Sequence, residues 1–157
     1  MQVVIELARR NIDEGGGPFG AAVFSTDGTF IAPGLNRVVV ASVPIAHAEI
    51  LAIGLAAQTL GSWDVAGLGS FELVSSTEPC AMCLGAVPWS GVEHLVCGAR
   101  DVDAREVGFD EGNKPADWVA DLEAAGIQVT QDVRRSAAVA LLRGYASSGG
   151  AIYNGRS

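Results

Sequence analysis

The sequence is poor in positive charge. It contains one lysine, Lys114, and ten basic residues against 18 acidic ones, so its formal net charge is −8. A protein that binds nucleic acid usually carries a basic patch that displaces the counterions of the phosphates. The nine scattered arginines could still gather locally, but the overall balance favours a small substrate.

Long apolar runs and a secretion signal are also missing. No stretch approaches the roughly 20 apolar residues that a membrane-spanning helix needs. Residues 1–10 lack both the basic start and the small-residue cleavage site of a signal peptide. We therefore expect no membrane contact and a cytoplasmic protein. With 157 residues, 49% of them apolar, the chain is long enough to form one domain, 1–157, with a substantial core.

Cysteine is scarce, with only Cys80, Cys83 and Cys97. An odd number that includes one close C-x-x-C pair, without a secretion signal, indicates metal or redox use and not a disulfide framework. Cys97 lies in an apolar run and is expected to be buried in a strand, because free cysteine is often buried.

Hydrophobic periodicity and turn residues predict an alternating order of elements. The Thr26-Asp27-Gly28 turn is expected to join the first two strands as a hairpin. The later alternation of strands and helices predicts a three-layer α/β/α fold around a five-stranded mixed sheet. A short helix plus a loop is expected at 100–114, and 147–157 is predicted to be a tail whose apolar part docks. Helices are predicted at 2–13, 46–60, 79–89, 116–125 and 133–146, and strands at 19–25, 29–35, 71–75, 92–98 and 127–130.

Two short segments carry the chemistry, His47-Ala48-Glu49 and Pro79-Cys80-Ala81-Met82-Cys83. Proline suits the first position of a helix, so Cys80 and Cys83 are expected on one face of a first turn, where free N–H groups stabilise thiolates. Adding His47 gives two thiolates and one imidazole, which leave the fourth position of a tetrahedral zinc open to water, as a catalytic site requires.

Glu49 is interpreted as the proton carrier of this site. Near a helix terminus, its carboxylate can take a proton from the zinc-bound water and later give one to a leaving amine. The alternatives are a redox C-x-x-C pair, or a structural zinc site in which Glu49 only favours the helix dipole. A structural site would need a fourth protein ligand, and the sequence offers no obvious candidate.

Together the two segments resemble the signature of the zinc cytidine-deaminase-like superfamily. The resemblance covers nearly the whole chain and implies that superfamily's fold and a hydrolytic deaminase. It also implies one zinc per chain, with a bound water or hydroxide, held by His47, Cys80 and Cys83, and Glu49 as the proton shuttle. Since most relatives are oligomers, a homodimer is expected.

The residues around these segments look most like bacterial guanine deaminases, including those that accept aminated triazines such as ammeline. That resemblance implies that Asn36 binds the base, that Phe19 and Trp89 line it, and that Glu111 is a second proton carrier. The segment 106–111 differs from the family pattern in ending on glutamate, which leaves guanine or a triazine open as the substrate. Some guanine deaminases end on a tyrosine that caps the site of a partner subunit. Tyr153 is the candidate for this role here, but the chain differs from those relatives because four residues follow it. The full set of predicted substrate-binding residues is Phe19, Asn36, Ala48, Trp89, Asp110 and Tyr153.

Each of these residues also has an ordinary structural interpretation. Phe19 and Trp89 could be core aromatics, Asn36 a turn residue, and 110–111 a solvated acidic loop. His94 is expected to be a surface or hydrogen-bonded histidine and not a ligand.

Three other functions remain as alternatives. A tRNA adenosine deaminase is disfavoured by the negative charge and by Trp89-Ser90-Gly91, where such enzymes commonly carry Ser-Arg. A cytosine or cytidine deaminase is disfavoured by the Phe109-Asp110-Glu111 segment. A non-enzymatic, zinc-stabilised binding module is disfavoured by the presence of Glu49.

Overall fold

The computed structural model describes residues 1–154, so Gly155 to Ser157 of the predicted tail lie outside it. Its centre is a five-stranded sheet in the order β2-β1-β3-β4-β5. β1 (Gly20–Ser25) pairs antiparallel with β2 (Phe30–Leu35) and with β3 (Phe71–Thr77). β4 (His94–Ala99) and β5 (Gln128–Thr130) continue the sheet in parallel. The direction of pairing therefore changes at β3.

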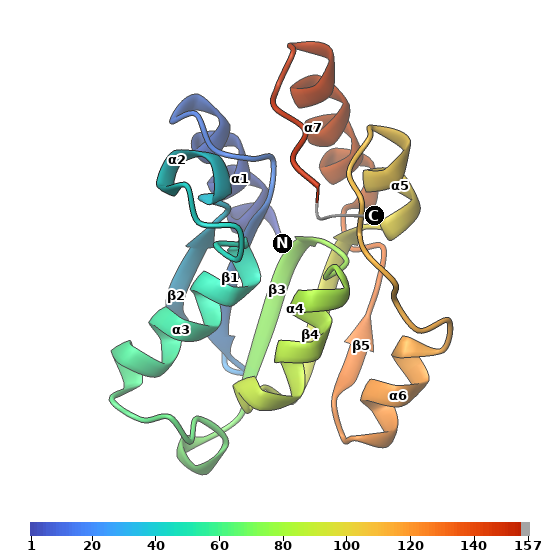
Figure 1. Ribbon diagram of the computed structural model, residues 1–157. Coiled ribbons are helices and arrows are strands. Elements are labelled where there is room, and N and C mark those ends of the chain that lie inside the picture. The colour runs from blue at the N-terminus through green and yellow to red at the C-terminus, as the bar shows by residue number, and fades with distance from the viewer. Residues whose placement is uncertain (155–157) are drawn as a thin grey trace.

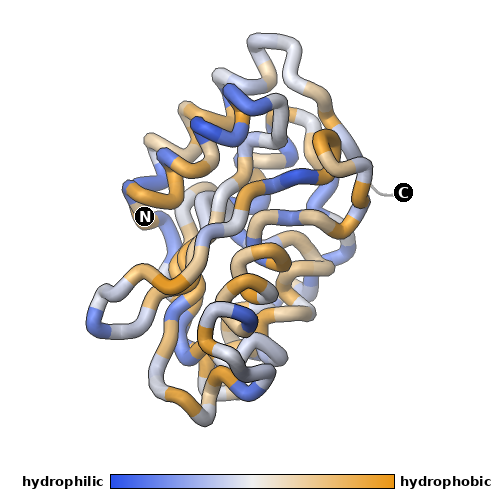
Figure 2. Tube along the Cα trace, turned by 90° about the vertical axis from the view of Figure 1, so that its left-hand side faces the viewer, coloured by the Kyte–Doolittle hydropathy of each residue, from blue (hydrophilic) through white to orange (hydrophobic). Residues whose placement is uncertain are grey.

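Helices cover both faces of the sheet, which confirms the predicted α/β/α architecture (Figure 1). One face carries α3 (Ala48–Leu60), α4 (Ala81–Ala86) and α6 (Trp118–Ala124), and the other carries α1 (Gln2–Asp13) and α7 (Arg135–Ser147). Figure 2 shows hydrophobic and hydrophilic residues alternating along α1, the helix next to the N-terminus. No helix within residues 1–154 combines the length and the apolar character that a bilayer crossing requires. The connections contain α2 (Val38–Ala41), α5 (Asp101–Glu106) and two 3₁₀ turns, Ala66–Leu68 and Val87–Ser90.

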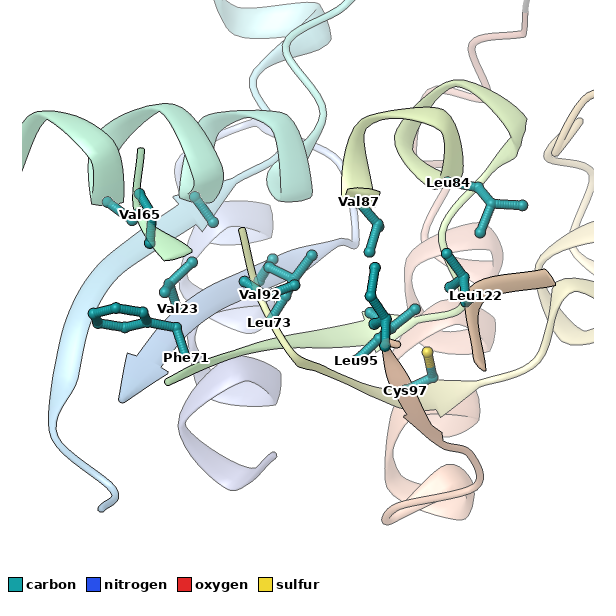
Figure 3. Close-up of a cluster of buried hydrophobic side chains, with 14 of the residues drawn as sticks. Val23, Val65, Phe71, Leu73, Leu84, Val87, Val92, Leu95, Cys97 and Leu122 are labelled. Atoms are coloured by element: carbon teal, nitrogen blue, oxygen red, sulfur yellow. The ribbon is translucent and has the colours of Figure 1, made fainter. Parts of the chain in front are cut away.

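The strands place alternate residues on the two faces. Val23, Leu73 and Leu95 are fully buried beneath α3, α4 and α6 (Figure 3), whereas Ala22 and Val74 are buried on the α1 side. Each large aliphatic side chain buried in this way contributes about 1.5–3 kcal/mol. The period-two pattern of the sequence therefore corresponds to a sheet that is covered on both sides.

The close packing of α3 on β2 fixes where the start of α3 lies. Ala48, Ala52 and Ala56 recur every four residues and are buried against the sheet. A Cβ atom at Gly34 of β2 would lie 1.9 Å from the carbonyl oxygen of Ala48, so only glycine permits this approach.

Four helices, α3, α4, α6 and α7, begin two residues later than predicted. α3 begins at Ala48 and α4 at Ala81, because His47 and Cys80 have extended backbones and act as N-cap residues. The prediction that Pro79 occupies the first helical position is therefore wrong. α4 also ends early, at Ala86, and continues as a 3₁₀ turn that contains Pro88, which cannot donate a helical hydrogen bond.

Candidate active site

The three predicted metal ligands meet where the N-termini of α3 and α4 converge. His47 caps α3, Cys80 caps α4, and Cys83 lies in the first turn of α4. Their ligand atoms all lie within 4.8 Å of one another, and Cys80 Sγ is 3.5 Å from His47 Nδ1. The partial positive charge of helix N-termini stabilises thiolates here.

The donor set fits zinc. Hydrogen bonds from the Cys83 thiol and from His47 lower the pKa of Cys80 to about 4, and sharing its proton with Cys80 raises the pKa of Cys83. Burial opposes ionisation of His47, but the Cys80 thiolate outweighs it and raises the pKa of His47. A divalent metal would displace the protons of Cys83 and His47. Within residues 1–154 the cluster has no fourth protein ligand, which leaves a tetrahedral ion with an open position.

Glu49 lies beside this cluster, in the first turn of α3, and only 6% of it is exposed. The hydroxyl of Ser75, on β3, donates a 3.0 Å hydrogen bond to Glu49 Oε1. Burial, and then the negative charge of Cys80, raise the pKa of Glu49. A carboxylate with a raised pKa next to a metal site is suited to accepting and returning a proton.

A small inner cavity of about 30 Å³ adjoins the cluster, and a wider one of about 430 Å³ lies outside it. Four predicted substrate residues, Phe19, Asn36, Asp110 and Tyr153, line the inner cavity together with Glu49 and Glu111. His47, Cys80, Asp110, Glu111 and Tyr153 line both cavities. Among the described residues, no lysine or arginine lines either cavity.

The two neighbouring acidic residues have different surroundings. Glu111 is 6% exposed, and burial, followed by the charges of Cys80 and Glu49, raises its pKa to about 8. Asp110 is instead held at the edge, where its Oδ1 accepts hydrogen bonds from Arg105 (3.2 Å) and from the N–H of Gly112 (2.9 Å). Within residues 1–154, Glu111 is thus the one of the two whose carboxyl group makes no ion pair.

The C-terminal segment folds back over the cavity of its own chain. The hydroxyl of Tyr153 donates a 2.7 Å hydrogen bond to Oδ1 of the buried Asn36, and burial raises the pKa of Tyr153. Phe109 packs edge-on between Phe19 (4.8 Å between ring centroids) and Tyr153 (5.3 Å). Asn154 Oδ1 accepts a hydrogen bond from the Asp110 N–H at 2.8 Å. The predicted docking of the tail is therefore present in residues 148–154.

Two predicted substrate residues do not line either cavity. Trp89 is 88% exposed, in the 3₁₀ turn after α4, at the end of that helix remote from Cys80. Ala48 is fully buried in the core beneath α3. A single chain does not bring Trp89 to its own pocket, because the rigid helix α4 separates the two. His94, as expected, is hydrogen-bonded, to Thr130 at 2.8 Å.

Two residues that sequence reasoning missed also contribute. Ser75 holds Glu49, as described above. Glu78 lines the inner cavity and accepts hydrogen bonds from the Asp101 N–H (3.0 Å), Gln131 (2.6 Å) and Lys114 (3.3 Å). The available signal was the polar run that ends the otherwise apolar third strand, just before Pro79.

Comparisons with known proteins agree on one group of enzymes. Residues 1–99 match the sequence model of the cytidine and deoxycytidylate deaminase zinc-binding region. A guanine deaminase of Bacillus subtilis is 40% identical over 120 residues, which are 72% of this chain and 74% of that protein. The structure of a guanine deaminase from Nitrosomonas europaea is 52% identical, with a TM-score of 0.91 over 93% of this chain and 82% of that chain. A structure in complex with 2,6-diaminopurine is 53% identical, with a TM-score of 0.93 over 98% of this chain and 82% of that chain.

Proposed function

We propose that this chain, which belongs to the cytidine and deoxycytidylate deaminase family and is a zinc-dependent hydrolase, deaminates guanine to xanthine and ammonia. One observation carries the proposal: two buried carboxylates, Glu49 and Glu111, flank a three-ligand metal site on a cavity that Asn36 also lines. The guanine deaminases among its relatives support the choice of base.

In the proposed reaction, a C–O bond forms at the guanine carbon that carries the exocyclic amine, and the C–N bond to that amine breaks. Zinc, when bound by His47, Cys80 and Cys83, supplies Lewis acidity that lowers the pKa of water. Glu49 removes one proton from the attacking water and returns it to the ring. The water's second proton leaves the new oxygen as the C=O bond forms, and it replaces the proton that the leaving amine takes up. Ser75 occupies Oε1 of Glu49, so we assign the proton to the other oxygen, Oε2.

Glu111 is proposed as the second proton carrier. The amine must leave as ammonia, which requires a proton delivered to its nitrogen. A carboxyl group whose pKa lies at about 8 is largely protonated at neutral pH and can make this donation. The Glu111 carboxyl group can also form hydrogen bonds with the N1–H and the amine at that edge of guanine.

Asn36 and Phe19 are proposed to recognise the base. Oδ1 of Asn36 accepts hydrogen bonds from Tyr153 and from the N–H of Val38 (3.4 Å), and the Val38 bond does not depend on the C-terminal segment. The amide N–H₂ of Asn36 is therefore the group left for an acceptor on the base. The face of Phe19 offers apolar contact to a flat ring. An inner cavity of about 30 Å³ is too small for a purine, so we propose that residues 148–154 move when the base enters.

The cavity lining favours a free base over a nucleotide. Four acidic side chains, Glu49, Glu78, Asp110 and Glu111, line the inner cavity. Since no lysine or arginine among the described residues lines either cavity, a phosphate group would have no cationic partner. The same argument disfavours an RNA substrate.

Ammonia release from a panel of compounds tests this function. The zinc-loaded protein is incubated with guanine, adenine, cytosine, cytidine, ammeline, melamine and a tRNA anticodon stem-loop, with Glu49→Gln as the inactive control. Release from guanine, with or without ammeline, supports the proposal. Release only from cytosine, cytidine or the RNA would refute the substrate assignment and leave the metal site in place.

We further propose that the active form is a homodimer in which Trp89 reaches the pocket of a second copy. The support is an apolar surface beside the wide cavity, to which Ile45 (60% exposed) and Met82 contribute, and the exposed Trp89. Isolated apolar residues are common on surfaces, but a contiguous group of them indicates an interaction site. Three further exposed apolar residues, Val39, Val40 and Val43, lie in or just after α2, close to Ile45 in sequence.

Mixing two inactive variants tests whether Trp89 acts on the partner's site. Glu49→Gln removes the proton carrier and Trp89→Ala the aromatic wall. If Trp89 acts across the dimer, hybrids of the two variants contain one intact site and recover activity after the subunits are mixed and exchanged. No recovery, in samples that light scattering shows to be dimeric, would refute the assignment.

We also propose that residues 1–157 form one deaminase domain, and that it acts in the cytoplasm, where its three free cysteines would stay reduced.

A further inference from the structure

Asn11 is the only polar residue among the buried residues of α1. The others are Val4, Ile5 and Ala8, and Asn11 itself is 0% exposed. A buried side-chain amide lowers stability unless its hydrogen bonds are made within the protein. Its hydrogen-bond partners therefore show what it does at this position.

Among the residues that the structure describes, the side-chain amide of Asn11 bonds only to the two segments that frame the inner cavity. Its Nδ2 donates to the carbonyl oxygens of Gly17 (2.8 Å) and Asn36 (2.7 Å). Its Oδ1 accepts a 3.0 Å hydrogen bond from Arg37. The first segment leads directly to Phe19, and the second contains Asn36, so one side chain holds both walls of the cavity.

The backbone around Asn11 is shaped to admit it. A Cβ atom at Gly16 would lie 2.4 Å from both Nδ2 and Oδ1 of Asn11, which no real side chain tolerates. The N–H of Gly16 also donates to the backbone carbonyl of Asn11 at 2.8 Å. The two framing segments join each other directly as well, since the Asn36 N–H donates to the Phe19 carbonyl at 3.2 Å.

We propose that Asn11 is a positioning residue for base recognition: it does not contact the base, but it fixes Asn36 relative to Phe19 so that the Asn36 amide meets the base in one orientation. This inference rests on the proposed function, since it assigns Asn36 to the base. Losing Asn11 would loosen the walls of the cavity without touching the metal ligands or the carboxylates. It should therefore weaken substrate binding far more than it slows the chemical steps.

Asn11→Leu tests the proposal, because leucine has a similar volume and no hydrogen-bonding group. Val4→Ala is the matched control, since Val4 is equally buried in the same helix but lies outside this hydrogen-bond network. Asn11→Leu loses all three hydrogen bonds of the amide. The displaced Asn36 amide should then lose its one hydrogen bond to the base, so the KM for guanine should rise about tenfold. The kcat of the variant should stay within about threefold of wild type, with zinc content unchanged. Val4→Ala should lower Tm but leave KM unchanged.

Hydrogen exchange supplies a readout that does not depend on the substrate. Exchange should accelerate in peptides that contain residues 16–19 and 35–38 of Asn11→Leu, and not in the same peptides of Val4→Ala. If wild type fails to deaminate guanine, the proposed function fails, and exchange in these peptides still decides the role of Asn11. If Asn11→Leu does not fold, Arg37→Met, which removes the bond to Asn11 Oδ1 together with a half-exposed ion pair to Glu14, should raise KM by about two- to fivefold. Equal KM and equal exchange in the variants and the control would overturn the proposal.

Discussion

Glu111→Gln should stabilise the metal-free protein at alkaline pH while it weakens catalysis. The folded chain holds Glu111 with its pKa raised from 4.5 to about 8, first by burial and then by the charges of Cys80 and Glu49. Between these two pH values the folded state binds more protons than the unfolded state, so stability falls as pH rises through this window. At 1.36 kcal/mol per pKa unit, the full loss above pH 8 is roughly 4–5 kcal/mol. Glutamine resembles the protonated acid and does not titrate, so the variant avoids this loss.

Urea denaturation of the metal-free proteins, under reducing conditions, measures the effect. The stability gain of Glu111→Gln over wild type should grow by about 3 kcal/mol between pH 6 and pH 8.5, which is about 6–12 °C in Tm for a chain of this size. Taking the difference between the two proteins cancels the titration of His47 and of the cysteines. A gain that does not change with pH would refute the reasoning.

Asp110→Asn is the matched control for this experiment. It removes the carboxylate next in sequence, but that group is paired with Arg105 at 3.2 Å, so the variant should lose a little stability and not gain any. Zinc loading should shrink the gain of Glu111→Gln, because a bound cation offsets the part of the pKa shift that comes from the Cys80 thiolate. In the loaded enzyme, Glu111→Gln should lower kcat by about 10²-fold or more.

Three further outcomes follow from the site. Glu49→Gln should keep one zinc per chain, measured by metal analysis, and lose about 10²–10⁴-fold in kcat, because the proton carrier is gone; near-normal turnover would remove Glu49 from that role. Tyr153→Phe breaks the 2.7 Å hydrogen bond to Asn36 and should alter kcat/KM by about tenfold or less, measured with guanine against adenine; identical kinetics would show that this bond plays no part in the reaction. Chelation should abolish activity and lower Tm, and added Zn²⁺ should restore both; activity that survives complete metal loss would contradict the zinc assignment.

Much of the fold could be predicted from sequence because the strands are short apolar runs separated by clear turn residues. Val23, Leu73 and Leu95 follow the period of two that a covered sheet imposes. The helix starts were less accessible. Nothing in the local pattern shows that His47 and Cys80 are N-caps, because that geometry depends on α3 packing against Gly34 and α4 lying beside it.

The same difference between local and distant interactions separates the site residues that could be predicted from those that could not. The metal ligands and Glu49 lie in compact motifs, so spacing and residue type identified them. Asn11 and Ser75 act through partners far away in the sequence, Asn36 and Glu49. No local pattern indicated Asn11, and the polar run that contains Ser75 did not show which residue it would hold. Trp89 was assigned by resemblance alone, and in this structure it is exposed and lines neither cavity, so its contact with the base stays a proposal.

The metal and the two carboxylates act as one electrostatic unit. In the metal-free chain, Cys80 carries the most acidic thiol and Cys83 retains its proton. Burial, followed by the negative charge of Cys80, raises the pKa of both Glu49 and Glu111. The N-termini of α3 and α4 offset only part of this negative charge. A divalent cation allows both thiols to ionise, and its charge lowers the pKa of each nearby carboxyl group relative to the metal-free state. Glu49 lies in the first turn of α3, which the ligand His47 caps, so its pKa should fall more than that of Glu111. In the proposed mechanism, one carboxyl group then accepts a proton while the other donates one, which is the pairing that hydrolytic deamination requires.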